Sequence, residues 1–94
     1  MIYIEDNVKY VDVAYTIGRE LCGDCKDLFE KLESKGCVIF DFEGVRDANL
    51  NFFEQYEYQK AVYRRDSGER IHEINMSNDL IVVKKEYLRL RKVR

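Results

Sequence analysis

The stretch Cys37-Val38-Ile39-Phe40-Asp41-Phe42 places apolar side chains on both faces of an extended chain, and it decides the fold. A strand with one solvated face alternates apolar and polar residues, whereas a strand covered on each side reads as a nearly continuous apolar run. We therefore predict that residues 37–42 form the central strand of an α/β domain, with other elements packed on both faces.

The segments before this strand predict a hairpin followed by a long helix. Residues 2–5 and 8–13 are short runs rich in β-branched and aromatic side chains, and the Asp-Asn pair between them tolerates turn geometry. Residues 17–35 carry apolar side chains at helical spacing, with Thr16 as a candidate N-cap and Gly36 as a candidate C′ residue. The apolar stripe consists of Ile17, Leu21, Cys25, Leu28 and Leu32.

The segments after the central strand alternate between helix and strand patterns. Asn49 can cap a helix over residues 49–62 whose inward face is aromatic. Residues 69–76 suit a strand, and Ser77 or Asn78 opens a last helix. The order ββαβαβα predicts a mixed sheet of about four strands, with an N-terminal hairpin and three helices.

The composition fits a single soluble domain spanning residues 1–94. The chain has 94 residues, of which 46% are hydrophobic and 36% charged, enough for one core. No run approaches the ~20 consecutive apolar residues of a membrane span, and the N-terminus lacks the basic segment followed by an apolar segment that is typical of a secretory signal. We therefore expect a cytoplasmic protein, in a bacterial cell or a phage-infected host, without a membrane role.

Three cysteines, an odd number, argue against a secreted disulfide scaffold and leave two functional alternatives open. Cys22-Gly23-Asp24-Cys25 has the spacing of a thiol redox motif, but the apolar stripe places it within a helix, and the chain has no proline to form the cis-proline that faces such a motif. A zinc site could draw on Cys22, Cys25, Cys37 and His72. We favour buried cysteines and a partly buried strand histidine, and predict no metal.

Carboxylates at the end of the central strand raise the question of catalysis. Asp41, Glu43 and Asp47 follow the carboxyl end of that strand, where open α/β sheets often bind ligands. Neither a nucleophile with an adjacent base nor a glycine-rich phosphate loop accompanies them, since Gly18 and Gly44 are isolated. We therefore predict no catalytic residue and no cofactor.

Charge is divided unevenly along the chain. Residues 1–57 carry a net charge of −7 and residues 58–94 a net charge of +5. A solvated helix face with cations near its C-terminus explains the basic end, while nucleic acid or an acidic partner stays open as an alternative. This basic patch consists of Lys84, Lys85, Arg89, Arg91, Lys92 and Arg94.

Residues 38–45, followed by 48–53, resemble the central motif of STAS-like domains, a family related to sulfate-transporter and anti-sigma-factor-antagonist domains. In that family a hydrophobic strand ends in Asp-Phe-x-Gly-Val before a helix that opens with Ser/Thr positions. Arg19 near the start of the preceding helix and the segment 74–77 before the last helix are also similar. The resemblance covers about residues 8–90 and implies a four-stranded sheet with helices that binds another protein.

One departure from the family removes its phosphorylation switch. Asn49 and Asn51 stand where the family has Ser/Thr, so the helix can be capped but no hydroxyl is present to modify. The resemblance therefore implies a non-enzymatic regulatory module that contacts its partner through the loop after the central strand and the following helix. The expected contact residues are Asp41, Glu43, Arg46, Asp47, Asn49, Asn51 and Tyr58.

Two further expectations concern partners. A small phage-encoded inhibitor of a host defence complex, such as CRISPR machinery, is the alternative biological setting, and a thiol redox protein is the second alternative. We also expect a homodimer, held either by opposite charges or by an apolar stripe on the last helix. That stripe consists of Leu80, Val83, Tyr87 and Leu90.

Overall fold

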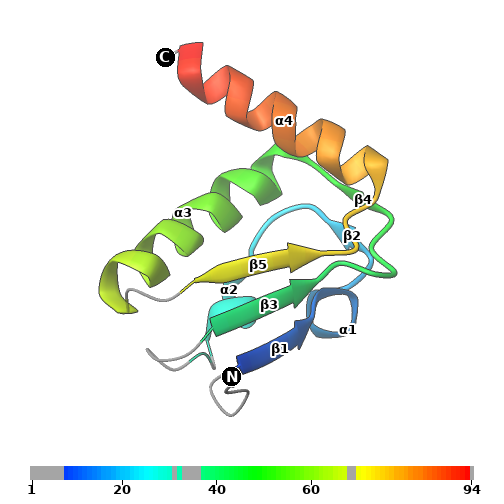
Figure 1. Cartoon of the computed structure of the whole chain (residues 1–94). Helices are drawn as coiled ribbons and strands as arrows, with labels where there is room; N and C mark the ends of the chain where they lie inside the picture. The colour runs from blue at the N-terminus through cyan, green and yellow to red at the C-terminus, as the bar shows by residue number, and fades with distance from the viewer. Residues whose placement is uncertain (1–7, 31, 33–36, 68–69, 94) are drawn as a thin grey trace.

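The computed structural model describes residues 8–30, 32, 37–67 and 70–93 of the chain (Figure 1). Except where β3 is followed directly by β4, strands and helices alternate along this part, which confirms the α/β class. The elements in chain order are β1 (Val8–Asp12), α1 (Val13–Ile17), β2 (Glu20–Leu21), α2 (Lys26–Phe29), β3 (Cys37–Asp41), β4 (Asp47–Ala48), α3 (Leu50–Ser67), β5 (Ile71–Ile74) and α4 (Asn78–Val93).

β3 is the middle strand of a three-stranded sheet with the order β1-β3-β5. Both neighbours run parallel to it, and Ile39 pairs with Tyr10 on one side and with His72 on the other. The prediction that the apolar run beginning at Cys37 supplies the central strand is therefore confirmed.

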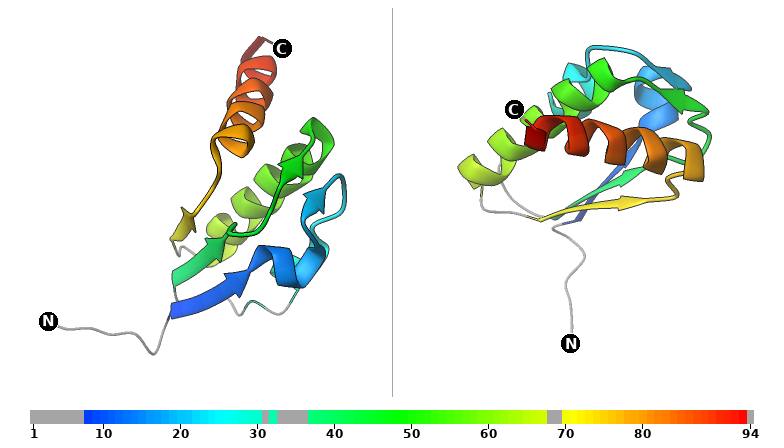
Figure 2. Two further views of the ribbon diagram at one scale, coloured as in Figure 1. Left: turned by 90° about the vertical axis from the view of Figure 1, so that its right-hand side faces the viewer. Right: turned by 90° about the horizontal axis from the view of Figure 1, so that it is seen from above.

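The helices lie on one side of this sheet (Figure 2). Because parallel strands that follow one another in order are joined by right-handed crossovers, the helices of both crossovers are expected on the same face. On that face Val38 and Phe40 are buried. On the opposite face Val8 is 40% exposed, Tyr10 57% and Ile74 39%. The expectation that the central strand is covered on both faces is thus wrong for the described residues.

The core between the sheet and the helices is aromatic, with Tyr56 of α3 at its centre. The ring of Tyr56 stacks on Phe52 with 5.4 Å between centroids, and it meets Phe40 and Phe42 edge-on at 5.7 and 5.8 Å. Phe53 is buried beside them. The aromatic inward face expected for this helix is confirmed.

A continuous helix over residues 17–35 is not formed. α1 ends before Gly18, whose φ of 106° is a conformation that glycine adopts far more easily than other residues, and the chain turns into β2. Asp12 caps α1 by accepting a hydrogen bond of 3.0 Å from the backbone N–H of Tyr15. Thr16, the expected cap, lies inside α1 and donates its hydroxyl to the Asp12 carbonyl at 2.7 Å.

The apolar spacing of this region reflects burial rather than helix. Leu21, Cys25 and Leu28 of the expected stripe are all buried, although they lie on β2, before α2 and within α2. Gly36, the expected C′ residue, lies outside the described residues. The occurrence of an apolar residue every three or four positions therefore predicted correctly which side chains face the core. It did not predict the conformation of the backbone between them.

Asparagine and serine caps begin the two long helices. Asn49 Oδ1 accepts a hydrogen bond of 2.9 Å from the backbone N–H of Phe52, as predicted for α3. Ser77 Oγ accepts one of 3.2 Å from the backbone N–H of Leu80 and caps α4, which confirms the first of its two expected caps.

Within the described residues the fold has four helices and sheets of three and two strands, in place of three helices and one sheet of about four strands. β2 and β4 form the second, parallel sheet, which the sequence analysis missed. The helix expected over residues 49–62 is α3, which continues further along the chain, and the strand expected over residues 69–76 is the shorter β5. The first strand of the expected hairpin, residues 2–5, lies outside the described residues. None of the described helices is both long enough and apolar enough to cross a membrane.

Candidate interaction surface

The loop between β3 and α3 brings most of the expected contact residues to the surface at the carboxyl end of the sheet (Figure 1). The exposed members are Glu43, Arg46, Asp47, Asn49 and Asn51. They follow one another within a short segment that the β2–β4 pairing fastens to the chain after α1. The structure therefore keeps these five residues together on one exposed segment, which runs from the loop after β3 through β4 into the first turn of α3.

Hydrogen bonds hold this loop in place. The backbone N–H of Arg46 donates to the carbonyl of Arg19 at 2.7 Å. The side-chain amides of Asn49 and Asn51 each lie 3.4 Å from the Cys22 carbonyl, to which they donate. The loop is thereby fixed against the segment around β2, so a partner would meet a surface that is already ordered.

Asp41 differs from the other expected contact residues, because it is only 5% exposed. Its carboxylate accepts hydrogen bonds from the Tyr10 hydroxyl, from the backbone N–H of Glu43 at 2.9 Å and from Asn75 Nδ2 at 2.9 Å. Asn75 has a φ of 60°, an unusual conformation that asparagine tolerates better than most residues. Asp41 therefore fastens the ends of β1, β3 and β5 together, and its assignment to the partner contact is corrected.

Tyr58 stands on the outward face of α3 and is 64% exposed. It lines a groove of about 380 Å³ between α3 and α4, to which α4 contributes Tyr87 and Arg91. The rest of the lining comes from α3, namely Glu54, Gln55 and Ala61. The structure thus places the expected contact residue Tyr58 beside an arginine and a second tyrosine from another helix.

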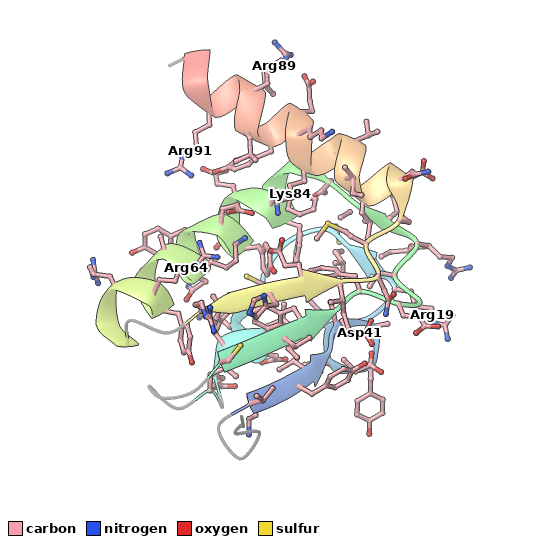
Figure 3. All side chains as sticks on the ribbon, viewed as in Figure 1. Arg19, Asp41, Arg64, Lys84, Arg89 and Arg91 are labelled. Carbon is pink, nitrogen blue, oxygen red and sulfur yellow. The ribbon has the colours of Figure 1, made fainter. Side chains whose placement is uncertain are left out.

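The basic patch is only partly a surface feature (Figure 3). Lys84 turns inward and lies 2.6 Å from Glu73 Oε1 on β5, which corrects its assignment to the patch. Arg89 is exposed but paired with Glu86 at 2.5 Å, while Lys85 and Arg91 are exposed. The side chain of Lys92 and the whole of Arg94 lie outside the described residues.

A cluster of charged side chains lies between α3, β5 and α4. Lys60 Nζ is 2.7 Å from Glu73 Oε2, and the Tyr56 hydroxyl donates to the same oxygen at 2.6 Å. Glu57 Oε2 is buried 3.1 Å from Lys60 Nζ, close enough for an ion pair but without hydrogen-bond geometry. Lys60 is itself buried, so Glu73 and Glu57 balance its charge together with that of Lys84.

The pKa values within this charged cluster follow from burial and pairing. Burial opposes ionisation of Glu73, but hydrogen bonds from Lys60, Lys84 and Tyr56 outweigh it and lower the pKa to about 2. Burial first, and the Glu73 carboxylate second, raise the pKa of the Tyr56 hydroxyl well above its ordinary value. Glu73 is therefore ionised throughout the neutral range, and its contacts with Lys60 and Lys84 link β5 to α3 and α4.

The cysteine motif does not lie within a helix, contrary to expectation. Cys22 is exposed in the turn after β2, and Cys25 is the buried residue immediately before α2. Burial, aided by the charge of Asp24, raises the pKa of the Cys25 thiol to about 11. Cys25 is accordingly a neutral core thiol at neutral pH, whereas Cys22 is accessible to solvent.

The residues considered for zinc and for carboxylate chemistry do not converge. In the described part of the chain, no group of three or more histidine, cysteine, aspartate and glutamate side chains has a metal-binding arrangement. His72 lies on β5 as expected, but it is exposed rather than partly buried. Cys37 is half-buried at the start of β3.

The apolar stripe of α4 is largely used within the chain. Leu80 is fully buried, and Val83 and Tyr87 pack against the same core. Leu90 remains exposed near the C-terminal end of α4. A dimer formed by this stripe is therefore not available without opening the core, and the expectation of such an interface is corrected.

No family model, curated protein or solved structure matches this chain. The groove beside Tyr58 therefore has to be judged from its own geometry. Glu54, Tyr58 and Ala61 are spaced at i, i+4 and i+7, so the sequence already placed them on one helix face. What the sequence analysis missed is the contribution of Tyr87 and Arg91, because only the packing of α4 on α3 brings them to that face.

Proposed function

We propose that this chain is a non-enzymatic, STAS-like module that binds another protein through a contact surface made of the segment 43–51 and the Tyr58 groove. The observation that carries the proposal is the exposed Tyr58 ring beside Tyr87 and Arg91 at a concave site between two helices. Tyrosine and arginine are enriched among the residues that dominate protein–protein binding energies.

The framework behind this contact surface supports a binding role. Tyr56 and Lys60 anchor the inward side of α3 to β5, and the Asn49 cap fixes the start of the same helix. Association costs less conformational entropy when the contacting residues are already ordered. The outward side of α3 is thus presented from a rigid base, with a hydrogen-bonded loop beside it.

A photo-crosslinking experiment tests the proposal directly. A photoreactive phenylalanine analogue replaces Tyr58 in one preparation and Val82 in another, because both side chains are 64% exposed on long helices. The two full-length chains are expressed in the native host and irradiated. We expect one protein to be captured from position 58 and not from position 82.

Binding measurements with the captured protein then test the individual residues. Tyr58→Ala and Arg91→Ala are each expected to weaken binding by about tenfold or more, as for central interface residues, while Val82→Ala leaves it unchanged. Equal binding by all three variants would show that the contact lies elsewhere. Mass spectrometry identifies the captured protein. A regulatory protein would indicate a regulatory module, whereas a component of a host defence complex would indicate a phage-encoded inhibitor.

A further inference from the structure

The outer edge of β1, the edge away from β3, is separate from the Tyr58 groove, which is lined by α3 and α4. Among the described residues β1 pairs only with β3, so its other edge offers backbone N–H and C=O groups. Four of the five β1 residues are exposed and the fifth, Val11, is half-buried. An unpaired strand edge of this kind accepts an added strand through main-chain hydrogen bonds.

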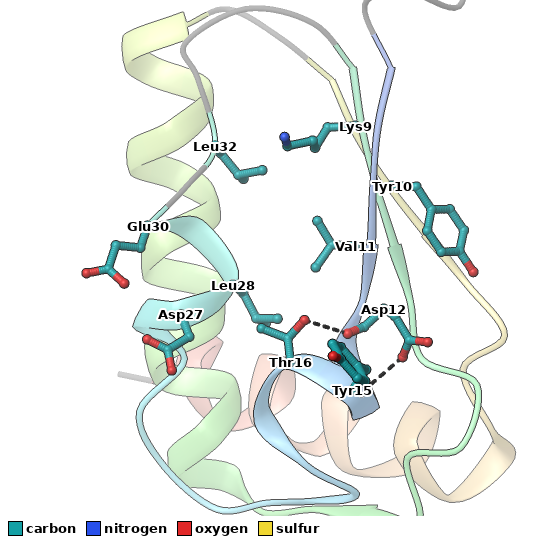
Figure 4. A pocket seen from close by; sticks show the side chains of 10 residues that line it. All are labelled: Lys9, Tyr10, Val11, Asp12, Tyr15, Thr16, Asp27, Leu28, Glu30 and Leu32. Carbon is teal, nitrogen blue, oxygen red and sulfur yellow. Dashed lines mark hydrogen bonds between the residues drawn. The ribbon is translucent and has the colours of Figure 1, made fainter.

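A groove runs along this edge on the side of the sheet that carries the helices (Figure 4). It has a volume of about 660 Å³, and Val11, Leu28 and Leu32 form its apolar lining. Tyr10 points to the opposite, uncovered face of the sheet. Side chains of a strand added beside β1 would therefore alternate between the groove and the surface next to Tyr10.

The rim of the groove is acidic. Asp12, Asp27 and Glu30 line it, and Lys9 is the basic side chain among the lining residues. Asp27 and Glu30 are exposed at the α2 side of the groove, where Figure 4 shows their carboxylates beyond the leucines and directed away from β1. A lysine or arginine side chain can lay its aliphatic stem on the leucines while its charged end reaches these carboxylates.

We propose that this edge groove binds an extended segment of a partner protein in which cationic and aliphatic residues alternate. The segment adds as a strand to β1, its cationic side chains enter the groove, and its aliphatic side chains lie beside Tyr10. Main-chain hydrogen bonds supply affinity and the alternation supplies specificity. This surface is separate from the one proposed above, so each can fail without the other.

The test measures peptide binding to the full chain by fluorescence anisotropy. The probe is a labelled octapeptide that alternates lysine and valine, and the charge-reversed control alternates glutamate and valine. Two further peptides are methylated on the backbone nitrogen, one at every lysine and the other at every valine. Each pattern removes the N–H donors from one edge of the peptide strand and leaves the side chains unchanged. We expect the glutamate peptide to bind at least about tenfold more weakly, and only one of the two methylated peptides to lose binding.

Matched protein variants locate the site. The double variant Asp27→Asn, Glu30→Gln is expected to weaken binding of the lysine peptide by about fivefold, in line with two exposed charge pairs. The control Asp79→Asn, Glu86→Gln changes the net charge equally but lies on α4. It is expected to leave binding unchanged.

Several outcomes would overturn the proposal. These are equal binding of the two charge types, binding that survives both methylation patterns, or equal effects of the two double variants. Binding that appears only after Ile2→Asp, Ile4→Asp would also overturn it, because the occupant would then be the chain's own first residues. Absence of binding to the unmodified chain and to that variant would show that the groove is not a peptide site.

Discussion

At the scale of single residues, Glu73 shows how one half-buried side chain joins three elements. It accepts hydrogen bonds from Lys60 and Tyr56 on α3 and from Lys84 on α4. The sequence predicted a strand at Glu73 and placed Lys84 on the surface. The residue type alone does not show whether a lysine on a helix that is buried on one face points to the core or to solvent. Charge alone therefore did not reveal the cluster.

Glu73→Gln is expected to lower the free energy of unfolding by about 2 kcal/mol at pH 7, after allowance for solvent screening. The pKa of Glu73 falls from about 4.5 to about 2 on folding. The stabilisation is therefore fully present above pH 4.5 and is lost as the pH falls towards 2. Urea denaturation at several pH values should show the difference between the native and variant chains shrinking over that window. A difference that persists at pH 2 would contradict the assignment, and the exposed Glu86→Gln serves as the control.

The two cysteines of the Cys22-Gly23-Asp24-Cys25 motif are expected to react at very different rates. A short pulse of iodoacetamide at pH 7.5 should modify Cys22, which is exposed, and spare Cys25, which is buried with a pKa of about 11. Mass spectrometry after proteolysis separates the two sites. In urea both should react, and rapid labelling of Cys25 in the folded chain would show that the core around α2 is open.

At the scale of elements, the region between β1 and β3 shows why periodicity predicts burial better than backbone. Leu21, Cys25 and Leu28 were correctly predicted to face the core, but they do so from a strand, a turn and a short helix. The break occurs at Gly18, whose positive φ the sequence could not reveal. By contrast, the caps Asn49 and Ser77 were predictable because capping is a local interaction.

Two glycine substitutions test this break. Gly18→Ala is expected to lower the free energy of unfolding by about 1–2 kcal/mol, because an added Cβ meets no atom there but the φ of 106° is unfavourable for alanine. Gly23→Ala should be neutral within about 0.5 kcal/mol, since its Cβ would lie 3.8 Å from Asn51 Nδ2, an ordinary contact. If the two residues lay in one continuous helix, both substitutions would stabilise the chain. Thermal unfolding of the two variants distinguishes these cases.

At the scale of the whole molecule, the parallel order β1-β3-β5 leaves one face of the sheet without a covering helix among the described residues. The apolar run of β3 predicted a strand covered on both faces. Whether both faces are covered depends on where the helices pack, and the sequence of the strand does not contain that information. Parallel sheets with an open face are uncommon in single chains. Half-buried Ile39 and the exposed Tyr10 and Ile74 therefore constitute a surface whose burial would be favourable.

This open face replaces the α4 stripe as the expected site of homodimer formation. Two copies related by a two-fold axis can stack these faces, and closed two-fold dimers are the commonest homo-oligomers. Light scattering should give a dimer mass at both 0.1 M and 1 M salt, because apolar contacts survive the shortening of the Debye length from about 10 Å to about 3 Å. Ile74→Asp is expected to give a monomer, whereas Val82→Asp, on the exposed side of α4, should remain a dimer. A monomer mass for the unmodified chain would exclude the dimer, and a mass that falls with salt would show that the opposite charges of the two halves of the chain hold it instead.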